Sequence, residues 1–527
     1  MKKFYLRQLF TAAAGVLGLV PTLALAAPFT PGNIVVARVG DGSAVLSASA
    51  AAVFLDEYTP AGQLVQSVAL PTSVSGANRI LTISGNATTE LSLTRSVDGH
   101  YLALAGYGAA PGTANVSSSS STDVARVVGL VGADGTINTS TSTGDAFTGV
   151  SIRGAATADG SSVYSVGAAS GVRYQAVGTG ASTQLNTTPT NIRTVGVAAD
   201  NLYVASASGS NVGVNQVGTG LPTASGQQVA LLPGAPGGGT GASPYGFYFA
   251  DLSATVPGVD VLYVADSRST GGGIQKWSLV GGTWTLNGTI ASTATFTLQS
   301  LGGSTSGNTV SLLATSTNAL FALNDATGYN VAPAITSLPA AIATPGTNTV
   351  FRGVAFAPVA AAPTIASFTP ASGPAGTLVT VTGANLTGTT GLTLNGVAVS
   401  GYTVVNATTL TFTVPAGASS GPIAVTTAVG SATSTTSFSL VLAAAASQAM
   451  PGLHVFPNPA TDHLTLKLPQ AGPATVLLRD LTGRVVLPTA ALPASQQLHL
   501  PATLAAGVYV LEVSQAGVTA TRRVVKK

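Results

Sequence analysis

The sequence contains no cysteine and little charge. None of its 527 residues is Cys, and Asp, Glu, Lys and Arg together account for 7% of the chain. Disulfides, thiolate metal sites and thiol nucleophiles are therefore excluded. The formal charge of +3 depends on Lys2, Lys3 and Arg7, because the remaining basic residues only balance the 17 acidic ones. Without a sustained basic stripe, we expect no nucleic acid among the partners.

Histidine is also scarce, which limits the available catalytic chemistry. Of the four His, His454, His463 and His499 lie close to the C-terminus, which leaves only His100 for the rest of the chain. His100 lies in the turn-like segment SVDGHYL, where a surface position is expected. A Ser-His-Asp triad or a His-based metal site would have to use this residue. We predict no catalytic residue, no metal site and no cofactor.

A glycosidase would need only two carboxylates. Most Asp residues fall in turn-like segments, where Asp is favoured because it caps the backbone. The adjacent pair Asp56 and Glu57 lies in the strand-like segment VFLDEYTP, where neighbouring side chains point to opposite faces and cannot readily share a site. We therefore favour a non-catalytic binding or adhesion protein, with a secreted carbohydrate-active enzyme (a glycosidase or a lyase) as the alternative.

The chain is rich in strand-forming and turn-forming residues. Its 63 Gly and 29 Pro, together with abundant Val and Thr, fit many short strands joined by turns. Charge also divides the chain, since residues 353–461 carry no Asp, Glu, Lys or Arg and both flanking segments do. Such breaks suggest domain boundaries near these positions. We predict an all-β protein of several domains.

Residues 28–360 repeat a loose pattern of a strand, a polar turn and a second strand rich in Val, Tyr and Ala. The segments VSIRGAATADGSSVYSVG and TNIRTVGVAADNLYVASA show it most clearly. Equivalent positions recur at intervals of 40 to 61 residues, which is typical of four-stranded propeller blades. The last repeat, FRGVAFAP, holds one strand only, so we expect it to complete a blade with the N-terminal strands. We predict six blades, with seven as an alternative count and a β-sandwich array or a β-helix as the alternative fold.

The repeat also predicts a binding site. Inner strands of a propeller run along the central channel, so one repeated register brings equivalent side chains toward a common axis. Three of the six equivalent positions hold Arg, which suits bidentate contact with a carboxylate. We hypothesise an anion-binding mouth for an acidic glycan or another carboxylate ligand. The alternative is that each Arg bonds to loop carbonyls or a nearby Asp and ties adjacent blades together. The equivalent positions are Ser92, Arg153, Arg193, Tyr245, Gln299 and Arg352, and the expected flanking aromatic residues are Phe247, Trp277 and Trp284.

Residues 1–27 have the pattern of a secretory signal peptide. A basic start is followed by the apolar stretch Leu9–Leu25 and by small residues that suit cleavage after Ala26 or Ala27. No later segment is long and apolar enough to span a bilayer. We therefore expect export, and no transmembrane anchor in the mature form.

The segment PTIASFTPASGPAGTLVTVTGANL, which begins at Pro363, combines a strand, a Pro-x-Ser-Gly-Pro turn, Gly-Thr and a Val/Thr strand. It resembles the opening of IPT/TIG domains, which have an immunoglobulin-like fold. The following strands alternate apolar and polar residues, as a half-buried sheet requires. The resemblance implies a spacer or protein-binding module over residues 361–442, followed by a linker over residues 443–452.

The last part of the chain, residues 453–527, contains HVFPNPATDHLTLKLP, ATVLLRDLTGRVV and AAGVYVLEVSQAGVTATRRVVKK. In order and spacing these segments resemble the type A C-terminal sorting domain of type IX secretion substrates from Bacteroidetes-type bacteria. Phe456 replaces the Tyr that is common there. The sorting residues carried over are Phe456, Pro457, Asn458 and Pro459, the turn at 480–483, Gly507 and Tyr509 of the strand GVYVLEV, and Arg522, Arg523, Lys526 and Lys527.

The resemblance implies a route out of the cell. The signal peptide would lead to the periplasm, and the type IX secretion machinery with its sorting or attachment enzyme would carry the chain to the cell surface or the extracellular space. We expect the final basic strand to be an exposed edge that a receptor reads. The complete prediction is a propeller followed by two Ig-like β-sandwich domains.

Overall fold

The computed structural model describes residues 27–441 and 450–527, apart from residues 269, 294 and 494. All of the predicted signal peptide except Ala27, and most of the predicted linker, lie outside these residues. The described part of the chain forms 41 strands and two short 3-10 turns, which confirms the all-β prediction. The chain divides into two compact units, one up to residue 361 and one over residues 362–527.

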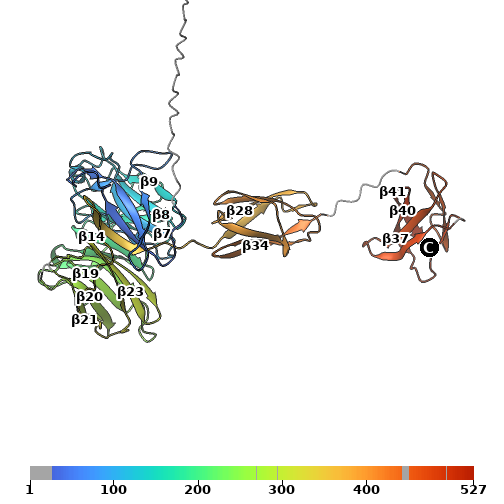
Figure 1. Cartoon of the computed structure of the whole chain (residues 1–527). Helices are drawn as coiled ribbons and strands as arrows, with labels where there is room; N and C mark the ends of the chain where they lie inside the picture. The colour runs from blue at the N-terminus through green and yellow to red at the C-terminus, as the bar shows by residue number, and fades with distance from the viewer. Residues whose placement is uncertain (1–26, 269, 294, 442–449, 494) are drawn as a thin grey trace, which may run out of the picture. The chain divides into compact units, whose positions relative to one another are not determined.

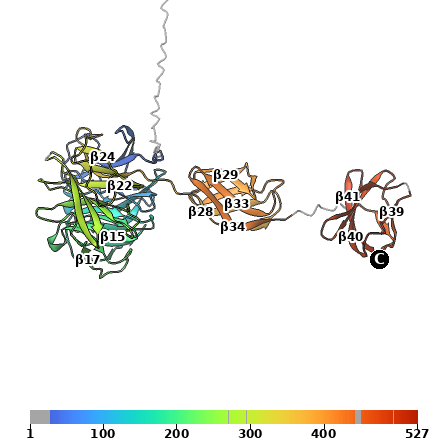
Figure 2. The same ribbon diagram turned by 90° about the horizontal axis from the view of Figure 1, so that it is seen from below.

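The first unit, which we call the head, is a ring of six antiparallel sheets (Figures 1 and 2). Each sheet has four strands except the last, which has three. The innermost strand of each sheet contacts the innermost strand of the next, and the sixth contacts the first, so the ring is closed. This ring of six sheets is consistent with the six-bladed propeller predicted from the repeat.

From the axis outward, the first blade consists of β25 (Val350–Phe356), β1 (Ile34–Val39), β3 (Val53–Tyr58) and β4 (Leu64–Ala69), and the second of β6 (Thr94–Arg95), β7 (Tyr101–Tyr107), β8 (Arg126–Gly132) and β9 (Ile137–Thr143). The third consists of β10 (Ile152–Ala156), β11 (Ser162–Gly167), β12 (Arg173–Ala176) and β13 (Thr183–Gln184), and the fourth of β14 (Ile192–Ala198), β15 (Asn201–Ser206), β16 (Gly213–Val217) and β17 (Val229–Leu231). The fifth consists of β18 (Pro244–Ala250), β19 (Val261–Asp266), β20 (Gly273–Val280) and β21 (Thr283–Ala291), and the sixth of β22 (Ser300–Ser306), β23 (Thr309–Ser316) and β24 (Ala319–Asp325). A small additional sheet pairs β2 (Ala50–Ala51) with β5 (Ile83–Ser84).

The first blade is assembled from both ends of the head. Its inner strand β25 comes from the C-terminal end, and its other strands β1, β3 and β4 come from the N-terminal end. The register runs from Ile34 opposite Phe356 to Val39 opposite Val350. This pairing was predicted from the single-strand last repeat. It leaves no open gap in the ring at which another chain could add a strand.

Glycines on the inner strands allow the blades to crowd around the axis. A Cβ atom added at Gly353 of β25 would lie 2.2 Å from the backbone nitrogen of Leu93, and one added at Gly246 of β18 would lie 2.3 Å from that of Leu301. Real side chains do not approach backbone atoms so closely. The backbones of neighbouring inner strands are therefore in direct contact at this level, and the channel there is narrow.

Apolar and paired polar side chains fill the space between blades. Tyr203, Phe249 and Trp284 form an aromatic cluster between the fourth and fifth blades. Between the fifth and sixth blades, Lys276 Nζ lies 2.8 Å from a carboxylate oxygen of Asp325, and both side chains are at most 1% exposed. Thr327 Oγ1 and the carbonyl of Gly328 accept the other hydrogen bonds of this ammonium. Because the ion pair is also hydrogen-bonded, its burial is tolerated.

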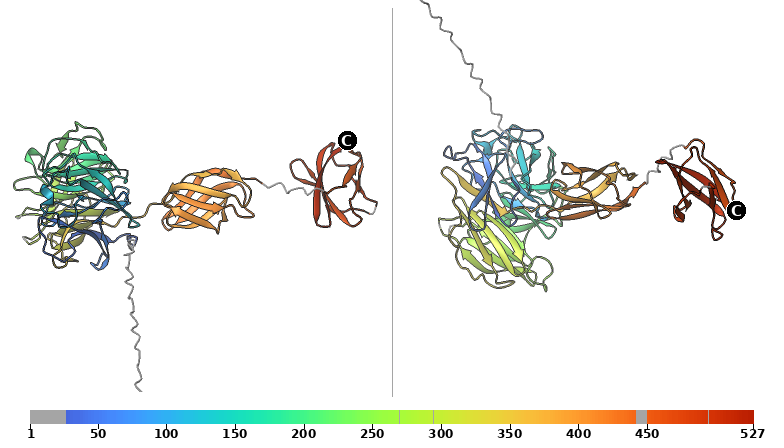
Figure 3. Two further views of the ribbon diagram at one scale, coloured as in Figure 1. Left: turned by 90° about the horizontal axis from the view of Figure 1, so that it is seen from above. Right: turned by 45° about the vertical axis from the view of Figure 1, so that its right-hand side comes forward.

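The second unit contains two sandwiches, which are described separately (Figure 3). In the first, residues of both sheets, such as Val381, Phe412 and Phe438, share one apolar core. Its sheets are β26 (Thr364–Thr369), β28 (Leu378–Ala384), β32 (Thr409–Thr413) and β31 (Tyr402–Asn406), and β27 (Ser372–Gly373), β34 (Gly430–Leu440), β33 (Gly421–Thr427), β29 (Thr389–Leu394) and β30 (Val397–Ala398).

The second sandwich has its own core, which includes Leu464, Leu478 and Leu511. Its sheets are β35 (His454–Phe456), β36 (His463–Lys467) and β39 (Gln497–His499), and β38 (Val485–Ala491), β37 (Ala474–Asp480), β40 (Gly507–Gln515) and β41 (Val518–Lys526). Among the described residues of the whole chain, no helix has the length and hydropathy needed to cross a membrane.

Substituting Gly353 tests the crowding at the axis. We expect Gly353→Ala to destabilise the head by about 1–3 kcal/mol, because the added methyl group must displace backbone of the next blade. Gly180→Ala is the matched control, since a Cβ atom there meets nothing within 4 Å. Both tryptophans of the chain, Trp277 and Trp284, lie in the head, so urea unfolding followed by tryptophan fluorescence reports on this unit within the intact protein. Equal stability of the two variants would contradict the crowding.

Candidate functional site

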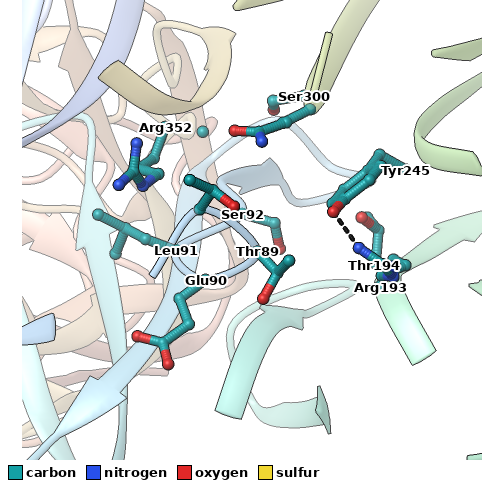
Figure 4. Close-up of a pocket in the computed structure, with 12 residues that line it drawn as sticks. Thr89, Glu90, Leu91, Ser92, Arg193, Thr194, Tyr245, Ser300 and Arg352 are labelled. Carbon is teal, nitrogen blue, oxygen red and sulfur yellow. Dashed lines mark hydrogen bonds between the residues drawn. The ribbon is translucent and has the colours of Figure 1, made fainter. Parts of the chain in front are cut away.

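The repeated register brings five of its six equivalent side chains to one pocket at the axis of the head (Figure 4). Each of the six positions lies in, or just before, an inner strand near its start. Arg153 is the equivalent residue that does not line the pocket. The lining residues are Ser92, Arg193, Tyr245, Gln299 and Arg352, together with Thr88, Thr89, Glu90, Leu91, Thr194, Ser300 and Gly353.

The pocket is small. It offers about 10 Å³ to the centre of a water-sized sphere, which is room for about one water molecule. A sugar ring does not fit into this space. Only one atom or a small group of a larger ligand could enter, and the rest of that ligand would remain outside the mouth.

Each of the three arginines reaches toward the following blade. Arg153 donates from Nη1 to Asn191 Oδ1 at 2.6 Å and to the carbonyl of Ile192 at 3.1 Å. Arg193 donates to the hydroxyl of Tyr245, and its guanidinium carbon lies 4.5 Å from the centre of that ring. These contacts correspond to the alternative considered for the arginines, in which they tie adjacent blades together.

Arg352 makes comparable contacts with the loop that precedes the second blade. Its Nε donates to the carbonyl of Ala87 at 3.2 Å, and its Nη2 donates to the carbonyl of Gly85 at 3.5 Å. Its Nη1 donates to the carbonyl of Phe351 in its own strand at 3.1 Å. Figure 4 shows Ser92 between Arg352 on one side and the Arg193–Tyr245 pair on the other. Arg193 and Arg352 therefore line different sides of the pocket and Arg153 does not line it, so the three arginines do not converge there.

Several polar atoms at this level have no hydrogen-bond partner among the described residues. Buried polar groups in proteins are nearly always satisfied by protein, water or ligand. Of the eight buried side-chain atoms without a partner in the described part of the chain, five belong to the equivalent positions or to a neighbouring residue. They are Ser92 Oγ, Arg153 Nε, Arg193 Nε, Thr194 Oγ1 and Gln299 Oε1. These atoms can still donate hydrogen bonds to a ligand or water and accept hydrogen bonds from one.

Burial lowers the pKa values of two of the three arginines. It lowers the pKa of Arg352 to about 10. Burial, together with the nearby charge of Arg193, lowers the pKa of Arg153 to about 10 as well. A guanidinium with a pKa near 10 is still protonated at neutral pH. The axis therefore keeps its positive charges in a poorly solvated environment.

Glu90 is the acidic group of the pocket, and it was not predicted from the sequence. Its side chain is 3% exposed and accepts a hydrogen bond of 2.7 Å from the hydroxyl of Tyr107. Burial raises the pKa of the Glu90 carboxyl, while its hydrogen bonds and the charge of Arg352 oppose that rise. The only available signal was its place two residues before Ser92, at the start of an inner strand.

The aromatic residues expected at the mouth lie elsewhere. Trp277 and Trp284 belong to the aromatic cluster with Phe249, on the outer strands β20 and β21, and Phe247 packs against this cluster. None of the three lines the pocket. For the tryptophans the reason is that they lie on outer strands, and only inner strands face the axis. Phe247 lies on the inner strand β18, but its side chain packs against the aromatic cluster.

The adjacent carboxylates of Asp56 and Glu57 both form contacts with neighbouring side chains of the head. Asp56 pairs with Arg38 at 2.5 Å, whereas Glu57 accepts hydrogen bonds from Asn33 and Gln66 at 2.7 Å each. The adjacent carboxylates therefore serve different partners, as their strand position predicted. In the regions that the structure describes, no group of three or more His, Asp or Glu side chains could hold a metal ion.

The residues predicted to form the sorting signal lie together at one edge of the C-terminal sandwich. Asn458 donates from Nδ2 to the carbonyl of Arg523 and accepts at Oδ1 from the backbone nitrogen of Val525, both at 2.8 Å. Ala460 bonds the carbonyl of Val525 and the backbone nitrogen of Lys527, also at 2.8 Å. The expectation that the basic end of β41 is a free edge is therefore wrong, because the segment after Phe456 covers it.

Replacing Glu90 tests the electrostatics of the axis. Between its ordinary value of 4.5 and its raised pKa, the folded head retains a proton that the unfolded chain has released, so this group stabilises the head less as pH rises through that window. Glu90→Gln keeps an acceptor for Tyr107 and cannot ionise. We expect the stability of Glu90→Gln relative to the unaltered protein to increase as pH rises from 4 to 8, measured by urea unfolding and tryptophan fluorescence. A difference that does not vary with pH would contradict the raised pKa.

Comparison with known families identifies the two sandwiches. Residues 454–527 match the secretion system C-terminal sorting domain, and residues 363–441 match the IPT/TIG domain. Neither match extends into the head. None of the curated proteins compared with the chain matches it significantly.

Solved structures resemble the chain only distantly. The extracellular domain of the one component system BT4673 from B. thetaiotaomicron is 11% identical with a TM-score of 0.32, and the match covers 96% of this chain and 59% of that one. A fungal alcohol oxidase of the AA5 family, in complex with copper, is 10% identical with a TM-score of 0.30, over 79% of this chain and 98% of the oxidase. The Bacteroides ovatus mixed-linkage glucan utilization locus SGBP-B, in complex with a heptasaccharide, is 17% identical with a TM-score of 0.13, over 42% and 52%.

These low scores transfer no activity to the head. The matches to the two sandwiches agree with the resemblances found in their motifs. The chain ends in an IPT/TIG domain followed by a type IX secretion sorting domain, and the protein is exported to the cell surface or the extracellular space.

Proposed function

We propose that the protein is an exported, non-catalytic binding protein whose head takes a carboxylate-bearing ligand, such as an acidic glycan, at the axial pocket. In this proposal the IPT/TIG domain is a spacer, and the sorting domain is the export and attachment signal. The head is the functional part that remains when the other domains are accounted for.

The observation that carries the proposal is the unused hydrogen-bonding capacity beside buried positive charge. Arg193 and Arg352 line the pocket, and Glu90 is its acidic group. Arg193 Nε and Ser92 Oγ are buried and have no partner among the described residues. A carboxylate oxygen can accept from both of these donors, and hydrogen bonds to charged groups are stronger than neutral ones.

The size of the pocket limits how such a ligand binds. Room for about one water molecule admits a single carboxylate oxygen, which would enter between Ser92 and Arg193 while the sugar remains outside. The uncharged parts of the ligand then contact only the rim of the head. Affinity would depend mainly on the acidic group, and the salt dependence of binding should be strong.

Arg193 is the residue that tests this proposal. We expect Arg193→Gln to raise the Kd of the mature full-length protein for an oligomer of galacturonic acid by about tenfold or more, because a charge-assisted hydrogen bond to the ligand is lost. The loss should flatten the salt dependence of binding, which isothermal titration calorimetry at several ionic strengths can measure. The methyl-esterified oligomer, which lacks the carboxylates, should bind poorly to both proteins.

Arg79→Gln is the control, because Arg79 is exposed and does not line the pocket. It removes the same charge and should leave the affinity unchanged. If Arg193→Gln binds as tightly as the unaltered protein, the arginines serve only to tie the blades together. Release of shorter sugars during the titration would instead identify the head as a carbohydrate-active enzyme.

A further inference from the structure

The four-stranded sheet of the sorting domain has one face in the core and one face without a covering sheet. On its strand β40, Tyr509, Leu511 and Val513 are buried in the core. The alternate residues Val508 and Val510 therefore point away from the core and are half-buried. An outward face in a small sandwich is normally polar, so two valines there need an explanation.

The strand register shows which side chains accompany these valines. Val510 pairs with Arg479 of β37 on one side and with Arg523 of β41 on the other. Val508 pairs with Val525 of β41. Directly opposed residues of antiparallel strands share a face, so these side chains lie in neighbouring rows.

A third row extends the same surface. Glu512 pairs with Leu477 of β37 and with Thr521 of β41. The half-buried Leu477 adds another apolar side chain to the outward side. We call this surface the valine–arginine face, and it consists of Leu477, Arg479, Val508, Val510, Arg523 and Val525.

The charge of the valine–arginine face is positive. Neither Arg479 nor Arg523 forms an ion pair within the described residues, and Glu512 is the acidic neighbour in the adjoining row. Arg479 donates one hydrogen bond, to the carbonyl of Gly483 at 3.1 Å. Both guanidinium groups can therefore bind carboxylates of another molecule.

We propose that the valine–arginine face is the docking surface for a component of the type IX secretion machinery that presents an apolar patch flanked by carboxylates. The machinery must hold this domain during export, and charge complementarity selects an acidic partner. In this proposal the apolar side chains form the central contact with the partner, and the arginines flanking Val510 fix the position of the partner on the face. The outer edge at Arg523–Lys527 is covered by the segment after Phe456, which leaves the face as the more accessible surface.

Two other occupants are disfavoured by charge. A second copy of the domain would oppose arginines to arginines. The IPT/TIG domain of the same chain offers no carboxylate, since residues 353–461 contain no Asp or Glu. An acidic protein of the export machinery satisfies the arginines and the valines together.

Charge reversal on the face tests the proposal in the full-length chain. We expect Arg479→Glu/Arg523→Glu to lower the surface-exposed fraction by about tenfold or more, with accumulation of the protein in the periplasm, because like charges would then face the partner. Lys467→Glu is the matched control, because Lys467 is exposed on the other sheet of the same domain. Immunoblots of cell fractions measure both. Normal export of the double variant would overturn the proposal.

A misfolded variant would also fail to be exported, so limited proteolysis of the periplasmic protein must show an intact sorting domain. A second measurement does not depend on disruptive changes. A photo-crosslinking amino acid at Thr521, which is exposed beside the face, should capture a component of the export machinery. The same group at Lys467 should capture little. Capture only from position 467, or equal capture from both, would overturn the proposal.

Discussion

The antiparallel pairing of β25 with β1 is the interaction on which the head depends. It joins segments from the two ends of the unit, and no disulfide can take its place in a chain without Cys. Closure forces the inner strands into a ring, and the glycines at 246 and 353 let that ring contract until backbones touch. The axial pocket is a direct result, because a register repeated in each blade becomes a circle of side chains only when the ring is closed.

Most of the fold could be predicted from repeats and motifs in the sequence. The interval between equivalent positions predicted six blades, the single strand of FRGVAFAP predicted the shared blade, and the motifs of both sandwiches predicted their families. The site was less accessible. The repeat placed Ser92, Arg193 and Gln299 near the axis, but a one-dimensional register does not say whether a long side chain turns inward or reaches the next blade. All three arginines bond to the next blade or to the loop that precedes it, and Arg153, which donates to Asn191 there, is the one that does not also line the pocket.

Glu90 and the tryptophans show two ways in which the sequence did not predict the pocket. Glu90 lies two residues outside the repeated position, so no periodic signal marks it, yet the closed ring buries it beside Arg352. Trp277 and Trp284 are conspicuous in the sequence, yet strand order places them away from the axis. The sequence suggested that they bind ligand at the mouth, but they pack in the core between the fourth and fifth blades.

The bonds between Asn458 and β41 link the first motif of the sorting domain to its last strand. A chain that stops before Val518 lacks β41, which is one of the two strands paired with β40 and is also the strand to which Asn458 bonds. The core of this sandwich also needs Val524 from the same strand. We therefore expect a chain terminated before Val518 not to assemble the sorting domain, so that an interrupted synthesis yields a protein that is not exported rather than a shortened protein on the cell surface.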